Sequence, residues 1–266
     1  MSTFMKSPTI AIIGSGNMAS ALLEQLKEQR WPIRWICSRN ETSGKQLAND
    51  AGVPFFSPEQ IPDDAHVAMI LLCVPDDQIA SCARAFKKHA ETLVHFSGSV
   101  DITALETPHA GVIWPVMSFN AFRSYIWKQT PLLWEANSEE ATMSVKQFIE
   151  ALGGPGFMVN SENRRLMHLA AVFANNFTNA CIAAAQELAH KAQCPSNLLD
   201  SLILQTLMQA MHTEAVLHQT GPAKRGDNTT MNAHLRLLEN EPQLINCYRA
   251  MSELIVHQSK KLGEKQ

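Results

Sequence analysis

The sequence lacks the features that mark several large classes of protein. Its six cysteines are scattered, none forms a C-x-x-C pair, and their spacing matches no metal site. Several of them lie inside apolar runs, which is typical of buried thiols in a reducing compartment. The formal net charge is only -3, so no positive excess favours nucleic acid or an anionic membrane. We therefore expect a small molecule, and neither a metal nor a nucleic acid, as the ligand.

Signals for export or membrane insertion are also missing. The first residues, MSTFMKSP, contain no apolar signal-peptide segment, so we expect a cytoplasmic protein. Residues 166–186 carry no formal charge and are long enough for a bilayer, which takes about 20 residues to cross. Their polar side chains, among them His168, Asn175 and Asn179, are costly in lipid. We therefore expect this stretch to be a helix buried in the middle of a soluble domain.

The chain divides into two halves of different character. Short apolar runs alternate with helix-like segments as far as Asn160, a pattern typical of βαβ units, and their continuity indicates strands covered on both faces. Beyond Asn160 only helices are expected, at about 162–191, 195–218 and 241–261, with a loop at 219–230. We predict an α/β fold: a Rossmann-type doubly wound, mostly parallel sheet in a dinucleotide-binding domain over residues 1–160. An all-α domain for substrate binding and dimerisation would follow over residues 161–266.

A glycine loop follows the first expected strand directly, in the segment TIAIIGSGNMASALLEQL. In dinucleotide-binding turns, the first glycine permits the bend, the second lets the backbone approach the pyrophosphate, and the third position needs a small residue. Gly14, Gly16 and Ala19 fit these positions. The pyrophosphate would lie on the start of the following helix, at Gly14, Ser15, Gly16, Asn17 and Met18. A tight turn without a ligand is the alternative.

The end of the second expected strand bears on the choice of cofactor. An acidic residue there binds the ribose 2′-hydroxyl of NAD, whereas an Arg accommodates the 2′-phosphate of NADP. Ser38 and Arg39 stand at this position, followed by Asn40. The sequence therefore favours NADP, with a free, solvated Arg39 as the alternative.

Two further strand ends carry candidate residues, since ligands bind beyond the carboxyl ends of parallel strands. Val74 and Pro75 end the third main strand and would flank the dinucleotide, unless they serve only to start the next helix. The fourth main strand ends in HFSGS, which places Ser97 near the cofactor. His95 in the same segment is either a group close to the nicotinamide or a satisfied core histidine.

Polar residues of the helical half form two groups. At about 100° per residue, His168, Asn175 and Asn179 fall close to one line of an otherwise apolar helix. Such a stripe faces a wet groove or hydrogen-bonds to neighbouring helices. In the segment GPAKRGD, Lys224 and Arg225 are placed to bind a carboxylate or phosphate, although an exposed loop would look similar.

Together these segments resemble a known family. The glycine loop, CSRN, CVPDDQI, HFSGS, WPVMSF, AAVFANNFTN and GPAKRGD are similar to a family of NADP oxidoreductases. That family belongs to the broad class of pyrroline-5-carboxylate reductases and 6-phosphogluconate-dehydrogenase-like enzymes. The resemblance covers essentially the whole chain and implies a Rossmann domain followed by a helical dimerisation domain, hence a homodimer.

The chain also departs from its relatives. Related β-hydroxyacid dehydrogenases carry a catalytic lysine three residues before an asparagine on the corresponding helix. Val172 and Phe173 stand three residues before Asn175 and Asn176, so that enzyme type is disfavoured. Trp114-Pro115 stands where similar proteins often have His-Pro, and no histidine role can be assigned there.

These observations predict an NADP-dependent oxidoreductase. It would transfer hydride between the nicotinamide and a small, anionic C=O or C=N compound held in the interdomain cleft. His168 would exchange the proton, because an ordinary histidine titrates near neutrality. Asn175 and Asn179 would position the substrate, and Lys224 or Arg225 would hold its anionic group. The alternatives are a non-catalytic NADP-binding sensor or scaffold, and an enzyme resembling prephenate dehydrogenases.

Overall fold

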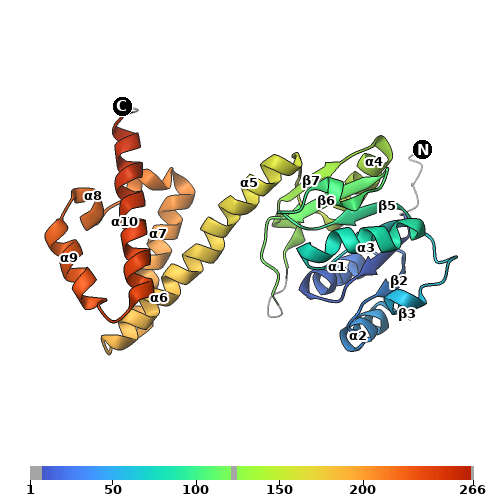
Figure 1. Cartoon of the computed structure of the whole chain (residues 1–266), viewed down its shortest axis with the longest axis horizontal. Helices are drawn as coiled ribbons and strands as arrows, with labels where there is room; N and C mark the ends of the chain where they lie inside the picture. Colours follow the sequence, from blue (N-terminus) through green and yellow to red (C-terminus); the bar gives the residue numbers. More distant parts are fainter. Residues whose placement is uncertain (1–7, 121–124, 265–266) are drawn as a thin grey trace. The chain divides into compact units, whose positions relative to one another are not determined.

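The computed structural model describes residues 8–120 and 125–264. These form two compact units, which divide between Phe173 and Ala174 (Figure 1). The strands of the first unit are β1 Ile10–Ile13, β2 Ile33–Cys37, β3 Phe55–Phe56, β4 Val67–Leu72, β5 Ala90–His95, β6 Ala110–Pro115, β7 Leu132–Ala136 and β8 Gly156–Met158. Its α-helices are α1 Asn17–Glu28, α2 Glu41–Ala51, α3 Ile79–Phe86, α4 Glu139–Leu152 and α5 Ser161–Ala171.

All eight strands belong to one sheet, in the order β3-β2-β1-β4-β5-β6-β7-β8. Every neighbouring pair is parallel except β6 and β7, which are antiparallel. The first six positions repeat the Rossmann order, in which the direction of winding reverses between β1 and β4. The predicted doubly wound, mostly parallel sheet followed by helices is confirmed.

The sheet is buried on both faces, as its continuous apolar runs indicate. Alternate residues of each strand point to opposite faces, so Ile10 and Ile12 belong to one core and Ala11 and Ile13 to the other. The first core contains the apolar faces of α1, α2 and α4, whereas α3 and the short 3₁₀ segment Ile102–Leu105 contribute to the second. Because helices cover both faces of the sheet, the loops that follow the strands lie together at the carboxyl ends of the strands.

Local capping explains where the two helices beside β2 and β7 begin. The side chain of Asn40 accepts a hydrogen bond from Ser43 N at the start of α2, and Ser138 accepts one from Ala141 N at the start of α4. Both helices end at a glycine in the left-handed conformation, Gly52 and Gly153. These caps are encoded locally, because each capping side chain lies three residues from the backbone N–H group that it binds.

The boundary between the units differs from the expected one at residue 160. Helix α5 belongs to the first unit, because its first turn is bonded to that unit by Ser161 and Arg164. The partners of these residues, Glu135 and Ile102, lie far away in sequence. The spacing of apolar residues along the helix therefore does not indicate that α5 packs against the sheet.

In the second unit, the described residues 174–264 form helices joined by turns and contain no strand. Its α-helices are α6 Thr178–Lys191, α7 Asp200–His212, α8 Pro222–Arg225, α9 Asn228–Leu237 and α10 Pro242–Gly263. Helices α8 and α9 were not expected, since the Gly, Pro and Asn of that stretch resemble a loop. Among the described residues, no helix has both the length and the apolar composition that a membrane crossing requires.

One expectation about the region 166–186 is wrong for the single chain. Phe173 and Phe177 are 52% and 49% exposed, and Leu166 is 65% exposed, so the stretch is not a buried helix. It is not a continuous α-helix either, because Val172–Phe177 forms a π-helical turn between α5 and α6. Each π turn accommodates about one additional residue, which rotates the following side chains by roughly 100°. The uniform spacing that predicted one polar stripe therefore does not hold.

Candidate functional site

A cavity of about 940 Å³ opens at the carboxyl ends of the strands in the first unit. Every residue that the sequence assigned to dinucleotide binding lines this cavity: Gly14, Ser15, Gly16, Asn17, Met18, Ser38, Arg39, Val74, Pro75 and Ser97. Trp114, Met117 and Phe119 add an apolar wall. The volume lies at the upper end of the range usual for ligand pockets, about 300–1,000 Å³.

The glycine loop shows why two glycines stand there. Gly14 has φ +110°, and a Cβ atom at this position would come within 2.1 Å of the carbonyl oxygen of Cys73. Gly16 has no atom within 4 Å of such a Cβ, so its lack of a side chain leaves open space at the start of α1. Gly14 is thus required by the turn, whereas the absence of a side chain at Gly16 leaves the N-terminus of α1 accessible.

The start of α1 is suited to an anion. Its N-cap residue, Gly16, offers no side chain to the first N–H groups, and the first turn contains no acidic residue. Free N–H groups and the positive end of the helix dipole attract negative charge. Because this helix end also lines the cavity, a pyrophosphate group fits the residues present.

Three hydroxyl groups meet at the end of β2. Ser15 Oγ lies 2.8 Å from Ser38 Oγ and 2.7 Å from Ser43 Oγ. Arg39 is exposed beside them, and its Nη2 donates to Gln78 Oε1 at 2.5 Å. Ser43 was not identified from the sequence, although its position in the first turn after the capping Asn40 brings it to the same place. Hydroxyl donors and a guanidinium together are the groups that bind a phosphate monoester.

The end of β5 holds a second polar group. Ser97 Oγ accepts hydrogen bonds from Ser99 N at 3.1 Å and from Val100 N at 3.0 Å. Ser99 Oγ in turn donates to the carboxylate of Asp76. Ser97 Oγ also lies 3.3 Å from Ser99 Oγ, and because Ser99 donates its own proton to Asp76, the Ser97 hydroxyl donates to Ser99. Ser97 is therefore held at the cavity wall by a chain of hydrogen bonds that ends at Asp76.

His95 is a core histidine. Its side chain is fully buried, and Nδ1 accepts a hydrogen bond from Ser97 N at 3.2 Å. Burial, with the nearby charge of Arg164, lowers the pKa of His95 to about 3. The ring is therefore neutral at physiological pH and does not serve as an imidazolium acid.

His168 lies on α5 and packs against Trp114 and Gly98. Its ring centroid is 5.4 Å from that of Trp114, in an edge-on arrangement. A Cβ atom at Gly98 would come within 2.5 Å of His168 Cδ2, so the imidazole packs directly on the glycine. Trp114 and Ser97, the neighbour of Gly98, both line the cavity.

The remaining sequence-assigned residues belong to the second unit and are not among those that line this cavity. Asn175 lies in the π-helical turn and Asn179 in α6, and both are exposed. Lys224 Nζ donates to the Gln219 carbonyl oxygen at 2.8 Å, and Arg225 ends α8. Their roles towards a substrate stay predictions. Within the described residues, no group of three or more His, Cys, Asp or Glu side chains is placed to hold a metal ion.

Comparisons with known proteins agree with this geometry. Residues 9–98 match the family model described as NADP oxidoreductase coenzyme F420-dependent, and residues 130–255 match a domain of unknown function, DUF2520. The Bacteroides fragilis protein BF3122, assigned as an NADP oxidoreductase, is 29% identical, with a TM-score of 0.84 over 95% of this chain and 99% of that one. The chain is an NAD(P)-dependent oxidoreductase.

Two more distant structures share the fold of this oxidoreductase. Pyrroline-5-carboxylate reductase from Streptococcus pyogenes is 18% identical, with a TM-score of 0.59 over 97% of this chain and 100% of that one. Pyrroline carboxylate reductase from Plasmodium falciparum, solved with NADP bound, is 16% identical, with a TM-score of 0.55 over 96% of this chain and 99% of that one. No curated protein sequence matches the chain.

The two family models divide the oxidoreductase differently from its compact units. The first model spans β1 to β5 and contains the glycine loop, the hydroxyl groups near β2 and Ser97. The DUF2520 model begins just before β7 in the sheet and extends into α10. It therefore includes His168 and α5, which belong to the first unit.

Proposed function

We propose that the oxidoreductase is an NADPH-dependent reductase of small, anionic compounds that carry a C=O or C=N bond. The observation that carries the proposal is the single cavity that joins the glycine loop, the hydroxyl cluster and the Trp114 wall, with His168 beside it. NADPH supplies a hydride when bound. The remaining requirement is a proton for the substrate's heteroatom, which the chain's own residues must deliver.

The end of β2 supports NADPH rather than NADH. Ser15, Ser38 and Ser43 place three hydroxyls beside the exposed guanidinium of Arg39. Ser38 and Arg39 stand after β2 in place of an acidic residue, so a 2′-phosphate would find both charge and donors. The NADP-bound relative from Plasmodium falciparum is consistent with this choice.

Proton delivery is assigned to His168 because of its position. The ring is half-buried against Trp114 and Gly98, so it is held in one place next to the cavity. Ser97 lines the cavity on the same side, where its hydroxyl is hydrogen-bonded to Ser99, Val100 and, through Ser99, to Asp76. Trp114, Met117 and Phe119 would exclude water from the reacting atoms.

The second unit supports the proposal of a homodimer. Of its described residues, Ala223 and Leu238 are the only buried hydrophobic ones. Large apolar side chains on α7 are exposed instead, among them Leu202, Leu204 and Met211 at 60%, 61% and 73%. An isolated monomer rarely exposes such a surface, and a second copy of the same chain would cover it.

Turnover and cofactor binding by a His168 variant test the function. NADPH oxidation is followed with a panel of keto acids, aldehydes, cyclic imines and cyclic acids, and then repeated with His168→Ala. General acid catalysis contributes roughly 10²–10⁴-fold, so turnover should fall by that factor while NADPH affinity stays constant. His66→Ala is the matched control, since this exposed histidine precedes the amino end of β4 and does not line the cavity.

The outcomes separate the candidate functions. NADPH binding without turnover of any compound favours a sensor or scaffold. Activity confined to cyclic acids favours an enzyme like the prephenate dehydrogenases. Full turnover by a His168→Ala protein that melts several degrees early would show that His168 is structural.

A further inference from the structure

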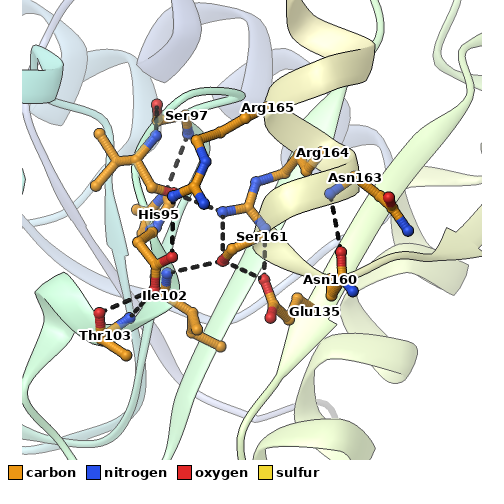
Figure 2. A network of polar contacts seen from close by, with 12 residues as sticks. His95, Ser97, Ile102, Thr103, Glu135, Asn160, Ser161, Asn163, Arg164 and Arg165 are labelled. Atoms are coloured by element: carbon orange, nitrogen blue, oxygen red, sulfur yellow. Dashed lines mark hydrogen bonds and ion pairs between the residues drawn. The ribbon is translucent and has the colours of Figure 1, made fainter.

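Arg164 is a charged side chain with no exposed surface, at the start of α5. Its Nη1 lies 2.6 Å from Glu135 Oε2, on β7. Its Nη2 donates to the carbonyl oxygen of Val100 at 2.5 Å and to Ser161 Oγ at 3.1 Å. Figure 2 shows these groups converging from α5, β7 and the loop after β5.

Ser161 closes the same network from the preceding turn. Its hydroxyl donates to Glu135 Oε2 at 2.6 Å and accepts a hydrogen bond from Ile102 N at 3.1 Å (Figure 2). Ser161 and Arg164 therefore bond to the same carboxylate oxygen. The first turn of α5 is fixed both to the sheet and to the loop at residues 97–102.

Stability alone is a poor explanation for this arrangement. Burying an ion pair removes two charges from water, and a well-packed apolar pair of similar volume often serves stability as well or better. Buried ionic groups are better suited to selecting one geometry, since their hydrogen bonds have fixed directions. Arg164 is therefore suited to orienting a neighbouring group.

His168 lies one helical turn beyond Arg164 on α5. Residues four apart lie on the same side of a helix, so His168 follows Arg164 along one face. His168 packs on Gly98 and Trp114. Gly98 belongs to the same loop as Val100, and Arg164 donates a hydrogen bond to the carbonyl oxygen of Val100. Arg164 thus fixes both the helix that carries His168 and the loop on which its ring rests.

We propose that Arg164 is a positioning residue that sets the His168 ring against Trp114 and Gly98. Glu135 and Ser161 are its supports, and none of the three lines the cavity. The catalytic consequence rests on the proposed function. The position of the ring does not, and it is measurable without a substrate.

The experiment observes the ring of His168 directly. Protein labelled with ¹³C in its histidine side chains gives ring resonances, and His168→Gln identifies that of His168 by its disappearance. The ring current of Trp114 displaces this resonance. Gly98→Ala provides the reference for a moved ring, because its new methyl group needs the space of His168 Cδ2.

The test variant is Arg164→Met combined with Glu135→Gln, which removes both charges together. We expect the His168 resonance to shift as in Gly98→Ala, with kcat reduced and the Kd for NADPH within twofold of the unmodified protein. Arg165→Met is the matched control, since the neighbouring guanidinium forms an exposed pair with Asp101 at 3.0 Å. This control should leave the resonance unmoved.

An unmoved His168 resonance in the folded double variant would overturn the proposal. If that variant does not fold, Ser161→Ala removes one hydroxyl and keeps the ion pair. Its His168 resonance should then move part of the way, and an unchanged one would again overturn the proposal. Failure of the unmodified protein to bind NADPH would refute the proposed function while leaving this test intact.

Discussion

Replacing Arg39 by Ala should weaken NADPH binding about tenfold and leave NADH binding unchanged. The guanidinium is held at the cavity edge by Gln78, whose Oε1 accepts from Nη2 at 2.5 Å. A hydrogen bond to a charged group contributes about 1.5–3 kcal/mol, and the exposure of Arg39 argues for the lower figure. About 1.4 kcal/mol corresponds to a factor of ten in Kd. Arg39→Asp adds repulsion and should reverse the preference.

Calorimetric titration with both nucleotides measures the two dissociation constants, and melting temperatures give an independent check. Arg84→Ala is the matched control, because Arg84 forms an exposed pair with Glu106 at 3.1 Å and does not line the cavity. Equal binding of NADPH and NADH by the unmodified protein would refute the assignment. An equal loss of affinity for NADPH and NADH in Arg39→Ala would also refute it, since NADH has no 2′-phosphate.

Two further predictions concern stability and assembly. Because the pKa of His95 is about 3 when folded and near 6.5 when unfolded, the unfolded chain binds more protons between these values. The free energy of unfolding should therefore fall as the pH drops through this window, by up to about 1.4 kcal/mol per pH unit. Urea unfolding at several pH values measures this dependence, and His95→Gln should make it flatter. The same pH dependence in both proteins would contradict the prediction. Light scattering should give twice the chain mass of 29.5 kDa, and the single-chain mass at all concentrations would refute the homodimer.

The cofactor side of the cavity could be predicted because its residues follow strand ends in the sequence. A parallel sheet brings the carboxyl ends of its strands to one edge, so Gly14, Arg39, Val74 and Ser97 meet without knowledge of distant contacts. Ser43 escaped notice because it lies one turn into α2, where a serine normally faces solvent. The two-residue strand β3 was too short to form a recognisable apolar run.

The domain boundary could not be predicted because it depends on a tertiary contact. Arg164 and Glu135 are 29 positions apart, and a charged pair of this kind has no counterpart in apolar periodicity. In the sequence, Arg164 stands among the polar and charged residues of the segment SENRR. Its complete burial assigns α5 to the first unit and brings His168 to Trp114.

The π-helical turn sets the limit of the polar stripe. A helical wheel assumes about 100° per residue, and a turn with i→i+5 hydrogen bonds breaks that assumption without changing the apolar composition. Val172–Phe177 lies between His168 and Asn179, so the wheel cannot establish that these side chains share a face. The assignment of His168 therefore depends on its contacts with Trp114 and Gly98. The regular helical spacing that grouped Asn175 and Asn179 with His168 no longer supports their assignment. Because π turns are frequent at functional sites, the turn itself is a reason to include Asn175 among the variants tested for turnover.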